Sequence, residues 1–424
     1  MDKVVGDIKG KRIVHLQFGS SPSGNYTIRL HEAFLEYGFD SYVLSLHSDV
    51  QGDPRIVSLG KFAKNLRKVN QKIQDFLTRK KPQDAGAFSL SFLGSDISGH
   101  ELVQKADIIY VHWILGGFLS VRNLKQIAAL GKPMVMILHD MWAITGGCSY
   151  SFDCDKFLTQ CGNCPIFPED KEVDTAFRQH VEKKRLYASF NNIFFVSPSH
   201  WLSDLAKRSE ITMNKPVFRI PNPIDRRRFK PFDKRVAKGI LGMEEFDFVI
   251  CFGANKVHSP YKGWMYLKEA VSRLAERVEG SKIGVLIFGS VATEEIMQSI
   301  PFPTKFMGFI RDDYTTNLVY NASDVFLAPS LADNLPTTII ESLCCGTPVV
   351  GFDTGGIPEM ISHGKNGYVA NYKDAEDFSK GIEYCLQNRL VGELLPEFNT
   401  DVVMGHHMDL VSFIEKEISV GDNN

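Results

Sequence analysis

Short apolar runs rich in β-branched residues alternate along the chain with longer segments of helical period. Five such runs lie in the first half, at residues 12–17, 42–46, 108–111, 134–138 and 193–196. Five more lie in the second half, at 248–252, 283–288, 325–328, 348–352 and 368–370. The pattern is typical of βαβ units, so we expect two parallel sheets covered by helices.

The chain length also favours two domains, because 424 residues are too many for one ordinary core. Residues 220–225 contain two prolines, which disfavour helix and favour an extended connector. We expect a first domain over residues 1–222, a second over 223–400 and a C-terminal helix over 401–424. The sequence leaves open which domain that helix packs on.

The composition of the chain excludes several classes of protein. The net charge of −2 and the ordinary apolar content argue against a nucleic-acid binder, a disordered chain or an integral membrane protein. The first residues show no signal peptide, and no window is long and apolar enough to span a bilayer. We therefore expect a cytoplasmic protein, with no nucleic acid among its partners.

The most informative segment is 328–350, which predicts strand, loop, helix, turn and strand. We expect the helix to run from about Pro336 to Cys345, with Asn334 as its N-cap. The N-terminus of such a helix offers unpaired amides and a partial positive charge, which suit a diphosphate. Asp333 in the loop and Glu341 in the helix are carboxylates that could accept hydrogen bonds from sugar and ribose hydroxyls.

This segment resembles the E-x7-E region of retaining glycosyltransferases of the GT-B fold, with Asp333 in place of the first Glu. The resemblance continues through residues 351–360 and 366–368, and upstream through 307–310 and 320–326. It implies an α/β protein with two facing Rossmann-like, doubly wound parallel-sheet domains. It also implies a nucleotide-sugar co-substrate, with no catalytic metal.

The resemblance assigns roles to residues of the second domain. Glu341 would hold the ribose and Asp333 the donor sugar, while Lys262 would neutralise the diphosphate. Ala254 stands where that family often has an Arg, and Lys256 is the nearest substitute. The other donor-binding residues implied are Asn255, Gly308, Phe309, Ile310, Asn334, Leu335, Pro336 and Thr337.

Candidate residues of the first domain surround the expected strand ends, which open onto the ligand site in such sheets. Gly19 and Gly24, followed by Asn25, lie in a loop after the first strand, where glycine allows close backbone approach. His112 and His139 follow two later strands. The resemblance implies that His139 contacts the donor sugar.

Four cysteines cluster in one segment: Cys148, Cys154, Cys161 and Cys164. Their spacing allows a structural Zn²⁺ site, disulfides or free thiols, and the sequence does not decide among them. The segment resembles an insertion in a surface-polysaccharide subgroup of the same family.

A basic helix is expected from Lys61 to Lys81, with apolar residues at three-four spacing. Such a helix can lie on an anionic membrane, here the inner face of the cell membrane. Packing on its own domain with a solvated basic face is the other interpretation.

Together these patterns predict a retaining glycosyltransferase that moves a sugar from a UDP- or GDP-sugar to a glycan, with a lipid-linked polysaccharide intermediate as the expected acceptor. Two alternatives stay open: a sugar-nucleotide epimerase of the same fold, and a non-catalytic glycan-binding scaffold.

Overall fold

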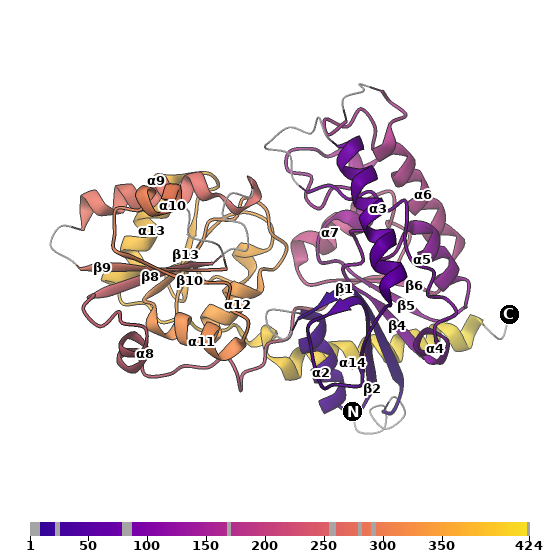
Figure 1. Cartoon of the computed structure of the whole chain (residues 1–424), viewed down its shortest axis with the longest axis horizontal. Coiled ribbons are helices and arrows are strands. Elements are labelled where there is room, and N and C mark those ends of the chain that lie inside the picture. Colours follow the sequence, from indigo (N-terminus) through magenta and orange to yellow (C-terminus); the bar gives the residue numbers. More distant parts are fainter. Residues whose placement is uncertain are drawn as a thin grey trace. The chain divides into compact units, whose positions relative to one another are not determined.

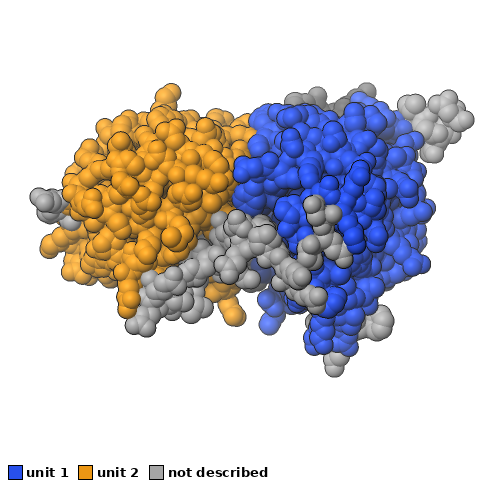
Figure 2. Space-filling view, turned by 90° about the horizontal axis from the view of Figure 1, so that it is seen from above, with its two compact units in different colours: residues 1–223, 400–424 blue, residues 224–399 orange. Residues whose placement is uncertain are grey.

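The computed structural model describes residues 9–21, 26–78, 87–167, 171–253, 260–278, 282–289 and 294–421. The chain forms two compact units. The first holds residues 1–223 and 400–424, and the second holds 224–399 (Figure 2). No helix in the described ranges is long and apolar enough to cross a bilayer.

The first unit contains a seven-stranded sheet in the order β3-β2-β1-β4-β5-β6-β7. All its strand pairs are parallel. The strands are β1 (Arg12–Ser20), β2 (Asp40–Ser48), β3 (Ile56–Ser58), β4 (Ile108–Val111), β5 (Met134–Ile137), β6 (Ile193–Ser197) and β7 (Val217–Arg219). The helices are α2 (Tyr26–Glu36), α3 (Lys61–Leu77), α4 (Glu101–Lys105), α5 (Val121–Ala128), α6 (Thr175–Ser189), α7 (His200–Arg208) and α14 (Thr400–Gly421), with the 3₁₀ turns η1 (Trp142–Ile144) and η2 (Lys156–Leu158).

The second unit contains a six-stranded parallel sheet in the order β10-β9-β8-β11-β12-β13. Its strands are β8 (Phe248–Gly253), β9 (Ile283–Phe288), β10 (Thr304–Gly308), β11 (Val325–Ala328), β12 (Val349–Phe352) and β13 (Gly367–Ala370). Its helices are α8 (Lys234–Ile240), α9 (Trp264–Arg277), α10 (Glu294–Ser299), α11 (Asp313–Ala322), α12 (Thr337–Cys344) and α13 (Ala375–Gln387), with the 3₁₀ turns η3 (Pro260–Lys262), η4 (Ile357–Glu359) and η5 (Pro396–Phe398).

Both sheets are buried on their two faces, which explains why their strands read as continuous apolar runs. Along β4, Ile108 and Tyr110 enter one core cluster, while Ile109 and Val111 enter another. Along β8, Val249 and Ile250 likewise divide between two clusters. The doubly wound α/β class expected from the sequence is confirmed for each unit.

The C-terminal helix α14 packs on the first unit, beside α2 (Figure 1). Its fully buried Val403, Val411 and Ile414 join Leu30 and Phe34 of α2 in one cluster against the first sheet. The choice that the sequence left open is therefore made by packing: α14 covers the first sheet together with α2.

The basic helix begins at Lys61 as expected, and α3 is described to Leu77, whereas Lys81 lies outside the described residues. Its apolar face is only partly buried. Val69 and Phe76 are exposed, and the buried Asn70 instead donates to the Leu90 carbonyl. Val69 and Phe76 are therefore exposed positions of the predicted apolar stripe, while Ala63 and Leu77 of the same helix pack on the core of the first unit.

Candidate functional site

The strand order of the second unit creates a topological switch point between β8 and β11. Neighbouring strands there connect to helices on opposite sides, and ligands of such sheets bind beyond the carboxyl ends at this place. The loop after β11, residues 329–336, lies at this point. Asn255 and Lys256, which follow β8, lie outside the described residues.

Lys262 and Asp333 meet at the switch point. The Lys262 Nζ atom lies 2.8 Å from the Asp333 Oδ2 atom and 3.5 Å from the Ser330 hydroxyl. Burial lowers the pKa of Lys262, but the Asp333 carboxylate outweighs it and raises the pKa above its usual value. The side chains remain 27% and 14% exposed. The lysine is therefore charged, fixed in place and still within reach of a ligand.

Two glycines allow this arrangement. Gly263 has φ +64°, and a Cβ there would lie 1.9 Å from the Pro329 carbonyl oxygen. Gly355 has φ +59°, and a Cβ there would lie 1.9 Å from the Asp333 carbonyl oxygen. Only glycine permits such backbone approach at positive φ. Each turn therefore packs directly on the backbone of the β11 loop, one at Pro329 and one at Asp333.

Helix α12 begins directly after this loop. Its N-cap is Pro336, and no side chain caps it. The expectation that Asn334 caps the helix is wrong, because Pro336 occupies the N-cap position with extended backbone angles. Asn334 and Leu335 lie in a bend before it and are buried. The first amides of α12, from Thr337 on, are the kind of uncapped donors that bind anions.

Glu341 lies inside α12 and is 4% exposed. The Tyr320 hydroxyl of α11 donates a hydrogen bond to its Oε2 atom at 3.1 Å. A buried carboxylate needs such a partner, because desolvation without hydrogen bonds is costly. Tyr320 thus fixes the orientation of Glu341 from the neighbouring helix.

The loop at the end of β10 supplies the next candidate residues. Gly308 has φ +62°, and its carbonyl accepts a hydrogen bond from the Gly289 amide at 2.7 Å. Phe309 is 64% exposed, and Ile310 packs partly on the core of the second unit. An exposed aromatic ring at this sheet edge offers a stacking surface for a flat ligand.

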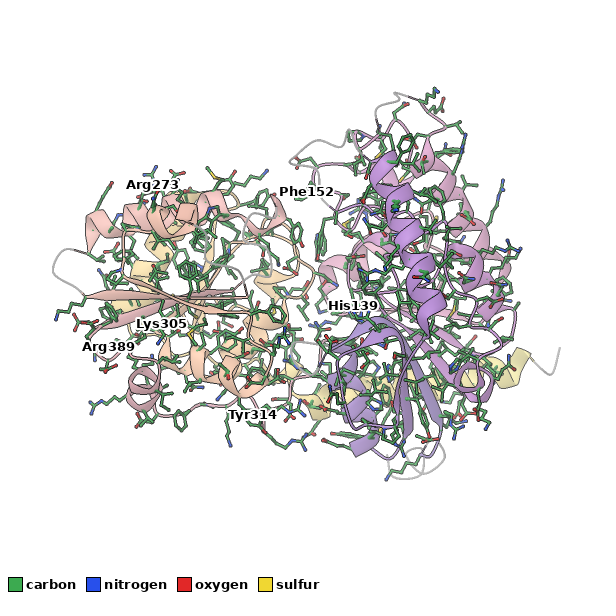
Figure 3. All side chains as sticks on the ribbon, in the orientation of Figure 1. His139, Phe152, Arg273, Lys305, Tyr314 and Arg389 are labelled. Atoms are coloured by element: carbon green, nitrogen blue, oxygen red, sulfur yellow. The ribbon has the colours of Figure 1, made fainter. Side chains whose placement is uncertain are left out.

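In the first unit, the corresponding switch point lies between β1 and β4. Gly19 lies near the end of β1, where a Cβ would approach the His47 ring to 2.7 Å. Gly24 and Asn25 lie outside the described residues. His112 and His139 follow β4 and β5 and are joined by a 3.2 Å contact between ring nitrogens. His139 is labelled in Figure 3.

A pocket of the first unit surrounds these histidines, with Trp113, Asp140 and Trp142 also in its lining. The Trp142 amide donates to Asp140 at 2.9 Å. This hydrogen bond lowers the pKa of the Asp140 carboxyl, but burial raises it by more, so the pKa lies above its usual value. The pocket therefore combines aromatic walls with several polar groups, as ligand pockets usually do.

The four clustered cysteines are free thiols. Burial raises the pKa of Cys161 to about 12 and that of Cys164 to about 11. Within the described ranges no three His, Cys, Asp or Glu side chains form a group that could hold a metal ion. These four described cysteines therefore form no disulfide, and the zinc alternative stays a prediction.

Part of the second unit matches a known protein family. Residues 247–388 match the family model of glycosyl transferases group 1. An uncharacterized glycosyltransferase of Methanocaldococcus jannaschii is 23% identical over 301 residues, which are 68% of this chain and 67% of that protein. A D-inositol 3-phosphate glycosyltransferase of Rhodococcus erythropolis is 26% identical over 170 residues, 38% of each chain.

Among solved structures, the Anabaena protein HepE in complex with UDP-glucose matches 97% of this chain and 100% of its own, with a TM-score of 0.56 and 17% identity. The protein is a glycosyltransferase whose second unit carries the match to group 1. Its two parallel-sheet units are those of the GT-B fold.

Sequence reasoning about this glycosyltransferase missed several residues that the structure places at the candidate sites. Tyr320 contacts Glu341, and Ser330 contacts Lys262. Asp140 lines the pocket beside His139. Asp140 directly follows His139, so its place in the chain was a usable signal. Tyr320 carries no local signal, because only the packing of α11 on α12 brings it to Glu341.

Proposed function

We propose that this glycosyltransferase moves a sugar from a UDP- or GDP-sugar to a glycan acceptor with retention of anomeric configuration. One observation carries the proposal: a charged lysine, Lys262, is held against Asp333 beside the uncapped start of α12. Two sources of positive potential at one sheet edge suit a diphosphate.

The proposed chemistry is charge stabilisation and positioning. As the glycosidic bond breaks, the departing nucleoside diphosphate gains negative charge, which Lys262 and the amides from Thr337 on would stabilise. Asp333 would orient the donor sugar and Glu341 the ribose, through hydrogen bonds from their hydroxyls. The leaving diphosphate would itself take the acceptor proton, so that the enzyme contributes mainly orientation.

We assign the remaining candidates supporting roles in the same proposal. Gly308, Phe309 and Ile310 would contact the base, and Asn255, Lys256, Asn334 and Leu335 the diphosphate and sugar. His139 would contact the donor sugar, and Gly19, Gly24, Asn25 and His112 would belong to the acceptor side.

For the acceptor we propose a lipid-linked polysaccharide intermediate reached at a membrane surface. The exposed Val69 and Phe76 lie on α3 together with exposed Lys68 and Lys72. Apolar side chains between lysines favour contact with an anionic lipid surface. Sedimentation with anionic vesicles, lost in Phe76→Ser but retained with Phe232→Ser on the second unit, would support this contact.

The test of the donor site begins with thermal shift, since a ligand that binds only the native state raises the melting temperature. We expect a UDP- or GDP-sugar to stabilise the enzyme and to release nucleoside diphosphate when a glycan acceptor is present. Lys262→Ala should lower kcat by about 100-fold or more, as removal of a transition-state charge partner does elsewhere.

Lys268→Ala is the matched control, because this lysine of α9 is exposed. It should retain full activity. Release of an isomerised sugar from donor alone would favour the epimerase instead, and a Glu341→Ala variant with unchanged turnover would refute the donor site.

A further inference from the structure

Three histidines of the first unit form a continuous row of ring contacts. The His15 Nδ1 atom lies 2.8 Å from the His112 Nε2 atom. The His112 Nδ1 atom in turn lies 3.2 Å from the His139 Nε2 atom. The residues belong to β1 and to the ends of β4 and β5, which are adjacent strands of the sheet. The row therefore runs from the sheet interior to the pocket that His139 lines.

Burial keeps the row uncharged. His15 is fully buried and His112 is 4% exposed. The Tyr26 ring packs edge-on against His139, with ring centroids 4.9 Å apart. Burial lowers the pKa of all three histidines, that of His139 to about 4. Desolvation is the largest cause of this shift at His15 and at His112, so the neutral rings prevail at ordinary pH.

A neutral imidazole has one nitrogen that donates and one that accepts, so the three tautomers are linked. If His15 donates from Nδ1, His112 accepts at Nε2 and donates from Nδ1, and His139 accepts at Nε2. The opposite direction would place a hydrogen on the His15 Nε2 atom, which is buried and has no hydrogen-bond partner among the described residues. Orphaned buried N–H groups are rarer than orphaned acceptors, which favours the first direction.

We propose that His15 and His112 are positioning residues that hold His139 with its proton on Nδ1. His139 then presents a hydrogen-bond donor to an oxygen of the bound sugar or phosphate, and its Nε2 lone pair is occupied by His112. His139 in this state orients a ligand and does not act as a general base. The assignment of a sugar-contacting role to His139 rests on the proposed function, whereas the tautomer order rests on the ring contacts alone.

The first test reads the tautomers directly. Long-range ¹H–¹⁵N correlation spectra of ¹⁵N-histidine-labelled enzyme distinguish a protonated from an unprotonated ring nitrogen, and a His139→Gln variant assigns the signals. We expect the proton of His139 on Nδ1 in the wild-type enzyme without ligand. A proton on Nε2 would overturn the proposal, and this reading requires no functional variant.

The second test breaks the row at His15, which is too deeply buried to touch a ligand. His15→Leu removes the first donor, and we expect mixed tautomers at His139 and a kcat/KM lower by about fivefold, the value of one neutral hydrogen bond. His15→Asn keeps an N–H near the Nδ1 position and should restore both. If His15→Leu does not fold, the His15→Asn spectrum and the wild-type spectrum still decide.

His180→Leu is the control, because His180 is equally buried in the same unit but lies beside Glu210, with 3.8 Å between Nε2 and Oε2. It should leave the His139 tautomer unchanged. An unchanged His139 tautomer in His15→Leu would refute the positioning role. Absence of transferase activity in the wild type would instead refute the proposed function, with the tautomer result standing independently.

Discussion

Lys183 shows how one buried side chain shapes the pocket loop of the first unit. Its Nζ atom donates to the Thr145 carbonyl at 2.8 Å and to the Trp142 carbonyl, and it lies 3.8 Å from the Trp142 ring centroid. These contacts brace residues 142–145 from α6. Burial lowers the pKa of Lys183 from its ordinary 10.5 to about 7. The unfolded chain therefore binds this proton more strongly than the native enzyme does.

The resulting prediction is a pH dependence of stability. From about pH 7 to about pH 8.5, the free energy of unfolding should rise with pH by up to about 1.4 kcal/mol per unit, because deprotonation relieves a penalty present in the native state. Urea unfolding across this range measures the slope. Lys183→Met should abolish it, whereas Lys184→Met, on the exposed side of α6, should keep it. A wild-type slope of zero would contradict the low pKa.

Between elements, the candidate donor site depends on backbone contacts more than on helix packing. The Leu331 amide donates to the Tyr261 carbonyl at 2.7 Å, and Gly263 fits against the Pro329 carbonyl. These contacts lock the turn that carries Lys262 onto the loop that carries Asp333. The ion pair at the site is thus a consequence of how η3 meets the β11 loop.

Gly263→Ala should separate the two segments. The added Cβ would lie 1.9 Å from the Pro329 carbonyl oxygen, and the alanine would have to adopt an unfavourable positive φ. We expect a loss of about 1 to 3 kcal/mol in stability and weaker stabilisation by nucleotide in thermal shift. Gly239→Ala, in α8 with no atom within 4 Å of the new Cβ, is the control. Equal nucleotide binding by both variants would argue against this role of the turn.

At the scale of the whole molecule, the C-terminal segment completes the first unit. The chain leaves that unit before Ile224, forms the second unit, and returns at Thr400. Val411 is fully buried in the α14 face that contacts the first sheet, whereas Val402 on the same helix is 40% exposed. Folding of the first unit thus requires residues at both ends of the chain.

Two matched substitutions test this dependence. Val411→Asp places an unpaired carboxylate in an apolar core and should lower the unfolding free energy of the first unit by about 3 kcal/mol or more. Val402→Asp should change it by less than about 0.5 kcal/mol. Urea unfolding combined with limited proteolysis measures both. Similar stability of the two variants would show that α14 is dispensable.

The repeated α/β pattern can be predicted from the sequence alone. All ten expected strands are present in the structure. They could be predicted because a parallel strand buried on both faces is a continuous apolar run, which is visible in the local sequence. The short strands β3, β7 and β10 were missed, since edge strands of a few residues bury too little to leave a pattern. The α12 segment was found from its proline and glycine signals, with an error of one residue at each end.

Which side chains contact one another depends on the tertiary fold. Lys262 and Asp333 are 71 positions apart, and His15 and His112 are 97 apart. Their contacts depend on which strands become neighbours in each sheet, and on turns that only glycine can make. The packing of α14 on the first sheet and the Tyr320 contact to Glu341 have the same origin. Periodicity and caps are local properties of the chain, whereas these contacts arise only after both sheets have formed.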